Sequence, residues 1–151
     1  TKTTNISPAN TKSLFSVSYN DYSIFNNNLK KFNSKTPDST KSFLNFTNEV
    51  AMADNALILH SLDTDLIIET IEEKSIAETY RDVDIYEFEN PEFFKSRLQP
   101  IISYEGANYF FKYDDFIVFT NTIETTKSIL SDALNNNTIV NSDAFKNIRG
   151  Y

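Results

Sequence analysis

The first patterned stretch of the chain changes from strand-like to helix-like spacing. Small polar and apolar residues alternate over 14–19, and a period of two is typical of a strand. Asn20 or Asp21 can cap a helix directly afterwards, because such side chains accept hydrogen bonds from the free amides of a first helical turn. The apolar residues that then recur at helical spacing are Tyr22, Phe25, Leu29 and Phe32. The pattern predicts a strand that leads into an amphipathic helix.

A second helix is predicted after a break at residues 35–39, which contain a proline and a capping residue. Apolar residues recur there every three or four positions, at Phe43, Phe46 and Val50. Asp54 and Asn55 end this helix. The next run, 56–59, is short and entirely apolar, which favours a strand that is covered on both faces near the centre of a sheet.

The middle of the chain holds one ambiguous stretch and two clearer ones. Residues 62–74 place apolar side chains at helical spacing but also contain good strand material over 66–70, and we favour the helix. Residues 83–88 predict a strand. Asn90-Pro91 is a typical helix start, with proline in the first turn, and Pro100 ends that helix.

Two strand-like runs, 107–113 and 116–120, are separated only by Asp114-Asp115, so they predict a tight hairpin. Asn121 followed by Glu124 resembles a capping box. The helix that it opens has apolar positions at Ile123, Leu130 and Leu134 and runs into three asparagines. A last short helix is predicted over 143–148.

The strand and helix that begin at residue 14 resemble those that begin at residue 115, since each strand ends at an asparagine and turns into an amphipathic helix. The chain thus suggests two related βα units. We predict an α+β fold with a mixed or largely antiparallel sheet and helices packed on it. Residues 1–12 are predicted to be a linker or disordered terminus, and 13–151 a single domain, as a fragment of a longer chain.

The amino-acid composition is sufficient for a large hydrophobic core and excludes several kinds of functional site. The 151 residues include 13 Phe and 8 Tyr but no Cys and only 2 Gly. Disulfides, thiolate nucleophiles and zinc–cysteine sites are therefore excluded, and a glycine-rich phosphate loop has no residues to form it. No apolar run approaches the roughly 20 residues of a membrane span.

The formal net charge is −7, and its negative part lies in the middle third of the sequence, where residues 51–100 carry four basic and twelve acidic residues. Such a field repels phosphate backbones. The basic residues that cluster in the first third are Lys30, Lys31, Lys35 and Lys41. They lack the density and the arginine content of a nucleic-acid surface, so we expect no nucleic-acid partner.

His60 is the single histidine and follows directly on the apolar run, a position at which catalytic groups are common in α/β proteins. The chain offers it no cysteine and no serine in an evident nucleophile motif. We therefore interpret His60 as a hydrogen-bonded structural residue. Asp63 and Asp65 could bind a hard cation, but the rest of a calcium loop is missing, and helix capping explains them more simply.

Acidic residues are numerous enough for a glycosidase-like pair, the candidates being Glu69, Glu72, Glu73, Glu78, Asp82 and Asp84. A pair at suitable spacing is expected by chance at this density, so a solvated acidic face is the simpler interpretation. Tyr109, Phe111 and Tyr113 share one strand face and could stack on sugars or bases. We favour cross-strand packing against residues 116–119.

The hairpin aspartates Asp114 and Asp115 are interpreted as a turn and not as a catalytic dyad. Asparagine sequons begin at Asn5, Asn45 and Asn136. In a chain this rich in asparagine, serine and threonine, such matches arise readily by chance. We assign no catalytic residue, no metal ligand and no cofactor from the sequence.

Two segments carry a resemblance to a known family. Tyr80-Arg81-Asp82-Val83-Asp84-Ile85-Tyr86 and residues 109–121 resemble stretches from the N-terminal region of large uncharacterised cell-envelope lipoproteins of Bacteroidota. The resemblance implies a fragment of a longer secreted or lipid-anchored protein. It carries over no functional residue.

The function expected from these observations is a non-enzymatic extracytoplasmic module, in the cell envelope, that recognises a protein or a glycan. One alternative is a hydrolase that uses carboxylates between residues 63 and 92. The other is a structural spacer. A hydrolase predicts two acids in one concave pocket, a binding module predicts an accessible apolar surface, and a spacer predicts neither. The sequence carries no signal for an oligomeric state.

Overall fold

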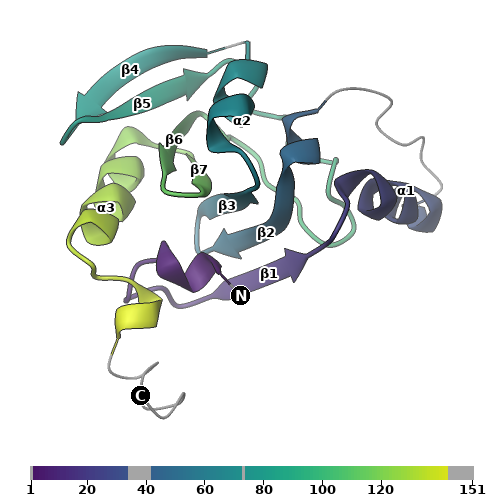
Figure 1. Ribbon diagram of the computed structural model, residues 1–151, viewed down its shortest axis with the longest axis horizontal. Helices are drawn as coiled ribbons and strands as arrows, with labels where there is room; N and C mark the ends of the chain where they lie inside the picture. Colours follow the sequence, from purple (N-terminus) through teal and green to yellow (C-terminus); the bar gives the residue numbers. More distant parts are fainter. Residues whose placement is uncertain (1, 34–41, 73, 143–151) are drawn as a thin grey trace.

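The computed structural model describes residues 2–33, 42–72 and 74–142, and Figure 1 shows their arrangement. Within this part of the chain seven strands form one sheet in the order β1-β2-β3-β7-β6-β5-β4, and every neighbouring pair is antiparallel. The strands are β1 (Leu14–Ser18), β2 (Thr47–Ala53), β3 (Ala56–Ser61), β4 (Lys74–Tyr80), β5 (Val83–Phe88), β6 (Tyr109–Tyr113) and β7 (Phe116–Thr120). The helices are α1 (Tyr22–Asn33), α2 (Thr64–Thr70) and α3 (Ile123–Leu134), with 3₁₀ turns η1 (Thr3–Asn5), η2 (Phe43–Phe46) and η3 (Ile139–Asn141). The predicted α+β fold with a largely antiparallel sheet is confirmed.

Both faces of the sheet are buried at its centre, where β3 and β7 lie side by side. Successive residues of a strand point to opposite faces. Leu57 and Leu59 of β3 therefore join one hydrophobic cluster, and Ile58 between them joins a second. The complete burial of β3 confirms the prediction of a strand covered on both sides.

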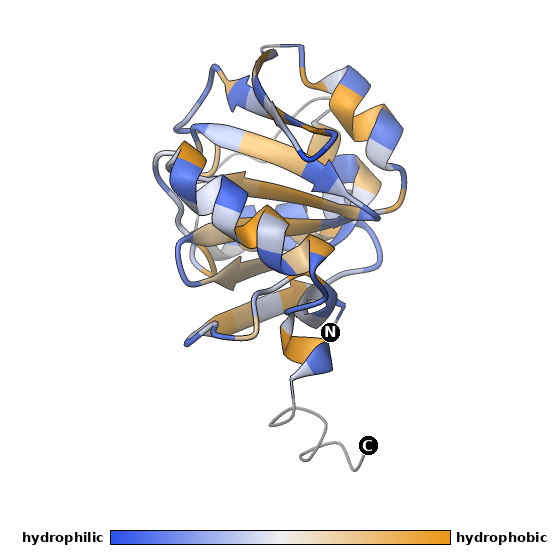
Figure 2. Ribbon diagram, turned by 90° about the vertical axis from the view of Figure 1, so that its left-hand side faces the viewer, coloured by the Kyte–Doolittle hydropathy of each residue, from blue (hydrophilic) through white to orange (hydrophobic). Residues whose placement is uncertain are grey.

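Different elements cover the two faces. Residues from α1, η2, α2 and the segment 91–104 pack on the face of Leu57 and Leu59, which we call the α2 face. Ile6, Ile129 and Leu130 pack on the opposite face, which we call the α3 face. Figure 2 shows α3 lying across strands that are mostly hydrophobic. The fold is thus a sheet between two unlike layers.

The two predicted strand–helix units are both present, as β1–α1 and β7–α3. Asp21 caps α1, since its Oδ1 accepts a hydrogen bond from the Ile24 amide at 3.2 Å. The units nevertheless occupy different places. β1 is an edge strand and α1 contributes Tyr22 to the α2 face, whereas β7 is central and α3 covers the other face.

The hairpin β6–β7 forms as predicted, with Tyr113 paired to Phe116 across Asp114-Asp115. Asp114 adopts a φ of 50°, a left-handed conformation that aspartate tolerates better than most side chains. The strand over 83–88 is also confirmed, as β5. The ambiguous stretch 62–74 contains a helix, α2, in agreement with the favoured alternative.

The prediction of a second helix through Phe43 and Val50, ending at Asp54-Asn55, is wrong. Phe43–Phe46 form a single 3₁₀ turn, and the chain then continues as β2 between β1 and β3. Strand pairing on both sides supplies β2 with hydrogen bonds that a helix would have provided locally. Phe43 and Val50 still reach the same hydrophobic cluster, but from two different elements. Their helical spacing in the sequence therefore reflects burial in the same cluster and not a place on the same helix.

The prediction of a helix from Asn90 to Pro100 is also wrong. Residues 91–101 form consecutive turns, in which amides bond to carbonyls three residues back, for example Phe93 to Asn90 and Lys95 to Glu92. The segment is tied to its neighbours by long-range bonds instead. The buried Lys30 of α1 donates from Nζ to Arg97 O at 2.8 Å, and Tyr104 Oη donates to Asn55 O at 2.7 Å.

The prediction of a linker or disordered terminus over residues 1–12 is wrong for the described residues 2–12. Ile6 is completely buried in the cluster of the α3 face. The backbone of this segment also pairs with the chain beyond α3, since the Ile139 amide donates to Ser7 O and Pro8 forms a bridge with Thr138. One apolar residue in a polar stretch was enough to anchor it, because these long-range bonds satisfy the neighbouring backbone groups.

Two smaller differences complete the comparison with sequence. Thr122, not Asn121, is the N-cap of α3, and its Oγ1 accepts from the Thr125 amide at 3.1 Å. The side-chain amide of Asn121 instead donates from Nδ2 to Gly106 O, and Gly106 has a φ of 72°. No strand had been predicted where β4 forms. The helix predicted over 143–148 lies outside the described residues.

Candidate functional site

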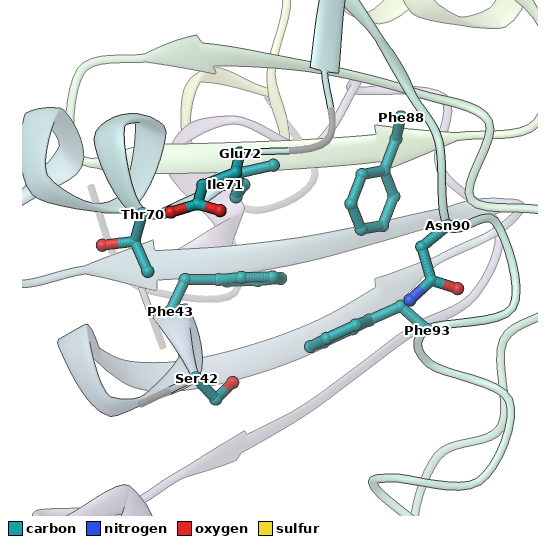
Figure 3. A pocket seen from close by; sticks show the side chains of 8 residues that line it. All are labelled: Ser42, Phe43, Thr70, Ile71, Glu72, Phe88, Asn90 and Phe93. Atoms are coloured by element: carbon teal, nitrogen blue, oxygen red, sulfur yellow. The ribbon is translucent and has the colours of Figure 1, made fainter. Parts of the chain in front are cut away.

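A cavity of about 550 Å³ opens on the α2 face, and Figure 3 shows the side chains that line it. It lies where the end of α2, the end of β5, the start of η2 and the turns after Asn90 meet. Its apolar residues are Phe43, Ile71, Phe88 and Phe93, and its polar residues are Ser42, Thr70, Glu72 and Asn90. We call this cavity the aromatic pocket.

The apolar wall of the aromatic pocket is part of the protein core. Phe43 and Phe93 stack with ring centroids 4.7 Å apart, and Phe88 meets Phe93 edge to face at 6.0 Å. Phe43 and Phe88 both contact the fully buried Phe119 of β7 as well. The rings are therefore held by packing on several sides, and the pocket is preformed.

Phe93 is the least buried of the three rings, and Figure 3 shows it beside Asn90. The guanidinium of Arg97 lies 4.0 Å from its ring centroid, a cation–π contact that orients the ring. The Lys30 and Tyr104 bonds hold the surrounding turns against α1 and the β2–β3 turn. The turns that carry Phe93 are thereby held in place by contacts outside the pocket.

Polar groups of the aromatic pocket are few, and two of them already serve the backbone. Ser42 Oγ accepts from the Leu44 amide at 3.1 Å, and Thr70 Oγ1 donates to Leu66 O at 2.7 Å. Asn90 is half-buried and Glu72 is exposed. Glu72 is the only charged side chain among the described residues that line the pocket.

A second, polar cavity of about 340 Å³ lies beside the ends of β1 and β2, where the β2–β3 register shifts between Thr47 and Glu49. Glu49 is nearly completely buried, and its carboxylate accepts hydrogen bonds from the Lys2 amide and Thr3 Oγ1. Tyr19 Oη contacts Thr47 Oγ1 at 2.5 Å, and burial raises the pKa of Tyr19 to about 12. These polar groups are occupied in holding the N-terminal segment and the edge of the sheet.

His60 lines neither cavity. Its side chain is buried, Nδ1 lies 2.6 Å from Asn48 Oδ1, and the ring packs edge-on against Phe116 at 5.2 Å. Burial lowers the pKa of His60, Lys2 lowers it further, and Asp115 and Glu49 oppose the shift. These contacts agree with the interpretation of a hydrogen-bonded structural histidine.

The two aspartates considered as metal ligands serve different partners. Asp63 Oδ1 caps α2 by accepting from the Leu66 amide at 3.0 Å, and Asp65 pairs with Lys112 at 2.6 Å. Among the described residues no three histidine or carboxylate side chains are grouped so that they could hold a metal ion. Helix capping by Asp63 is confirmed.

The candidate acids are dispersed. Glu78 pairs with Lys127 of α3 at 2.6 Å, Asp84 accepts from Thr79, and Asp82 lies in the β4–β5 turn. Glu69 is exposed on α2, and Glu73 lies outside the described residues. Among the candidates that the structure describes, only Glu72 lies in the aromatic pocket.

The aromatic residues of β6 serve packing, as predicted for Phe111 and Tyr113. Phe111 is buried in the cluster of the α3 face, and Tyr113 Oη donates to Ala133 O at 3.3 Å. Tyr109 is half-buried. Asn5, Asn45 and Asn136, which begin the sequons, are exposed.

Sequence reasoning missed the aromatic pocket because its residues were assigned to elements that do not form. Phe43 had been placed on the helix predicted to end at Asp54-Asn55, and Phe93 on a helix over 90–100. The available signal was the density of phenylalanine around two non-repetitive stretches. Which rings meet depends on long-range packing that local periodicity does not record.

Comparison of the chain with family models, curated proteins and solved structures gives no match. The resemblance to envelope lipoproteins therefore stays a prediction that depends on the quoted residues. None of the described helices is long and apolar enough to cross a membrane.

Proposed function

We propose that this protein is a non-enzymatic recognition module that binds an apolar side chain of a partner protein in the aromatic pocket. The observation that carries the proposal is a preformed cavity of about 550 Å³ whose apolar wall is three phenylalanine rings and an isoleucine, beside four polar residues. Ligand pockets are typically concave, mostly apolar and equipped with a few polar groups. In keeping with the lipoprotein resemblance, we place the module in an extracytoplasmic protein.

The chemistry of the lining favours a protein side chain over a sugar. Sugar recognition requires many hydrogen bonds to hydroxyl groups, and here Ser42 and Thr70 already bond to the backbone. Phenyl rings that are mostly buried offer a slot for an inserted group more than a platform for stacking. A carboxylate hydrolase needs two acids, and Glu72 has no second acid beside it among the described lining residues.

The probe for this proposal is N-acetylphenylalaninamide, titrated into protein with ¹³C-labelled isoleucine methyl groups. Ile71 lines the pocket, and Ile58 lies on the opposite face of the sheet as an internal control. We expect the Ile71 methyl signal to shift with a dissociation constant on the order of 1 mM, as for a ligand of this size, and Ile58 to stay unchanged.

Phe93→Ala should weaken this binding at least about tenfold, since a ring of the pocket is lost, whereas Phe15→Ala, which removes an exposed ring outside the pocket, should not. Two results would overturn the proposal. One is a shift of Ile71 with cellobiose but not with the phenylalanine derivative, which indicates a glycan. The other is no shift with either probe.

A further inference from the structure

The two edges of the sheet differ in how they are protected against pairing with another strand. Exposed edges offer free backbone groups, and natural proteins discourage pairing with charges, prolines and bulges. At one edge, β4 carries Lys74 and Glu78. Its register with β5 also shifts between Ile76 and Glu78. β4 therefore has two of these protective features.

The opposite edge strand, β1, has none of them. Its sequence is Leu-Phe-Ser-Val-Ser, without charge or proline. Its pairing with β2 runs without a shift from Leu14 to Ser18. Among the described residues β2 is its only strand partner. In Figure 1 no described helix or strand covers the outer side of β1, and α1 lies past its end.

The side chains of β1 also leave apolar surface on this edge. Phe15 is 49 % exposed, although it pairs with Met52 of β2. Val17 lies on the same face of the strand and packs against the cluster of the α2 face. Large exposed apolar residues on an unprotected edge are typical of strands that pair with another chain.

A second copy of β1 fits this edge in antiparallel orientation. With the two-fold axis at Ser16, Phe15 of one copy lies opposite Val17 of the other, and the reverse pair forms on the other side of the axis. Aromatic rings opposite β-branched residues are favourable cross-strand pairs. A symmetric interface of this kind closes after two copies.

Charge also favours a second copy at this place. The chain has a net charge of −7, which opposes self-association in general. Residues 13–20 carry no charge, however, and Lys12 and Asp21 flank them. Antiparallel pairing about Ser16 brings Lys12 of one copy to the end at which Asp21 of the other copy lies. Repulsion is therefore reduced, and attraction present, at this edge.

We infer that β1 is a self-association edge, at which two copies of the protein join their sheets through antiparallel pairing centred on Ser16. A five-residue strand buries little surface, so the dimer is weak. The inference is independent of the aromatic pocket, which lies on other elements.

Sedimentation velocity tests the association between about 10 µM and about 1 mM, the range of a small interface. We expect the wild type to shift from monomer to dimer over this range, and Phe15→Lys to stay monomeric. Thr79→Lys, which adds the same charge to β4, should associate as the wild type does. Circular dichroism verifies that each variant is folded. A wild type that is monomeric at every concentration overturns the inference.

Single cysteines test the register, because the chain contains no cysteine of its own. Ser16→Cys should form a disulfide-linked dimer on mild oxidation, since directly opposite Cα atoms lie within disulfide range in antiparallel pairs. Phe15→Cys should cross-link with Val17→Cys in a mixture at least about tenfold faster than either does alone, because antiparallel pairing places these positions opposite. Cross-linking of Phe15→Cys mainly with itself, or of Ser16→Cys no faster than Thr79→Cys on β4, would contradict the proposed pairing.

Discussion

The α2 face buries more and larger apolar side chains than the α3 face, and the two faces close in different ways. On the α3 face, a twelve-residue helix packs against strands that carry small side chains, including Ala51, Ala53 and Ala56. The cavity that α3 itself lines, beside Ala53 and Ala56, is about 120 Å³. On the α2 face, large rings are covered by a short helix, a 3₁₀ turn and the turns of 91–101, and the cavity is about 550 Å³.

The difference indicates what makes a pocket in this protein. A regular helix on small residues approaches the sheet closely and fills the space. Turns that carry large aromatic rings cannot pack so evenly against the sheet, because each ring must meet its neighbouring rings at a particular angle. The aromatic pocket is therefore a consequence of how this face is covered, and substitutions should affect the two faces differently.

The largest expected effect is the loss of the ring that links the pocket to the core. Phe119 is completely buried and contacts the rings of Phe43, Phe88, Phe94 and Phe110. Phe119→Ala should lower the free energy of unfolding by about 3–5 kcal/mol, measured by urea denaturation. Val118→Ala, the neighbour on the α3 face, removes fewer contacts and should cost less. Equal losses would argue against a dominant aromatic cluster.

A medium effect should come from adding volume, and it should depend on the face. Ala51→Leu overfills the closely packed α3 face and should cost about 1–3 kcal/mol of unfolding free energy. Thr70→Leu places a similar group at the aromatic pocket and should change stability by no more than about 0.5 kcal/mol. It should also weaken binding of the phenylalanine probe. Equal costs for both substitutions would remove the proposed difference in closure between the faces.

The smallest effect concerns pH and His60, which lies against Phe116 at the polar end of the α3 face. Because its pKa is lowered in the folded state, the unfolded chain takes up a proton first as the pH falls below about 6.5. His60 should therefore lower the free energy of unfolding below that pH and leave it unchanged above that pH. His60→Gln should reduce the loss between about pH 7.5 and about pH 5.5. An unchanged difference between these pH values would show that His60 does not contribute.

The predictions that held depended on short-range patterns with strong chemical reasons. The Asp114-Asp115 hairpin was predictable because two apolar strands separated by two turn-forming residues have few other arrangements. The Asp63 cap and the burial of β3 were predictable on the same grounds. The hydrogen bond predicted for His60 is also present, to Asn48.

The predictions that failed concerned segments whose backbone bonds come from distant residues. β2 obtains its bonds from β1 and β3, and the turns after Asn90 are held by Lys30 and Tyr104. The N-terminal segment bonds to residues beyond α3. The aromatic pocket combines two of these segments, so local periodicity could not show which of its rings meet.

The amino-acid sequence alone determined that this chain builds an α+β core, with a mixed or largely antiparallel sheet, from phenylalanine and branched aliphatic residues, without cysteine chemistry. Only the tertiary structure decided which rings face the pocket, which edge of the sheet is unprotected and which acid accompanies the apolar wall. The physical reason is how far apart in the sequence the interacting residues lie. Turns, caps and strand periodicity depend on neighbours within a few residues, whereas a cavity and a sheet edge are defined by contacts that are made or left unmade between distant parts of the chain.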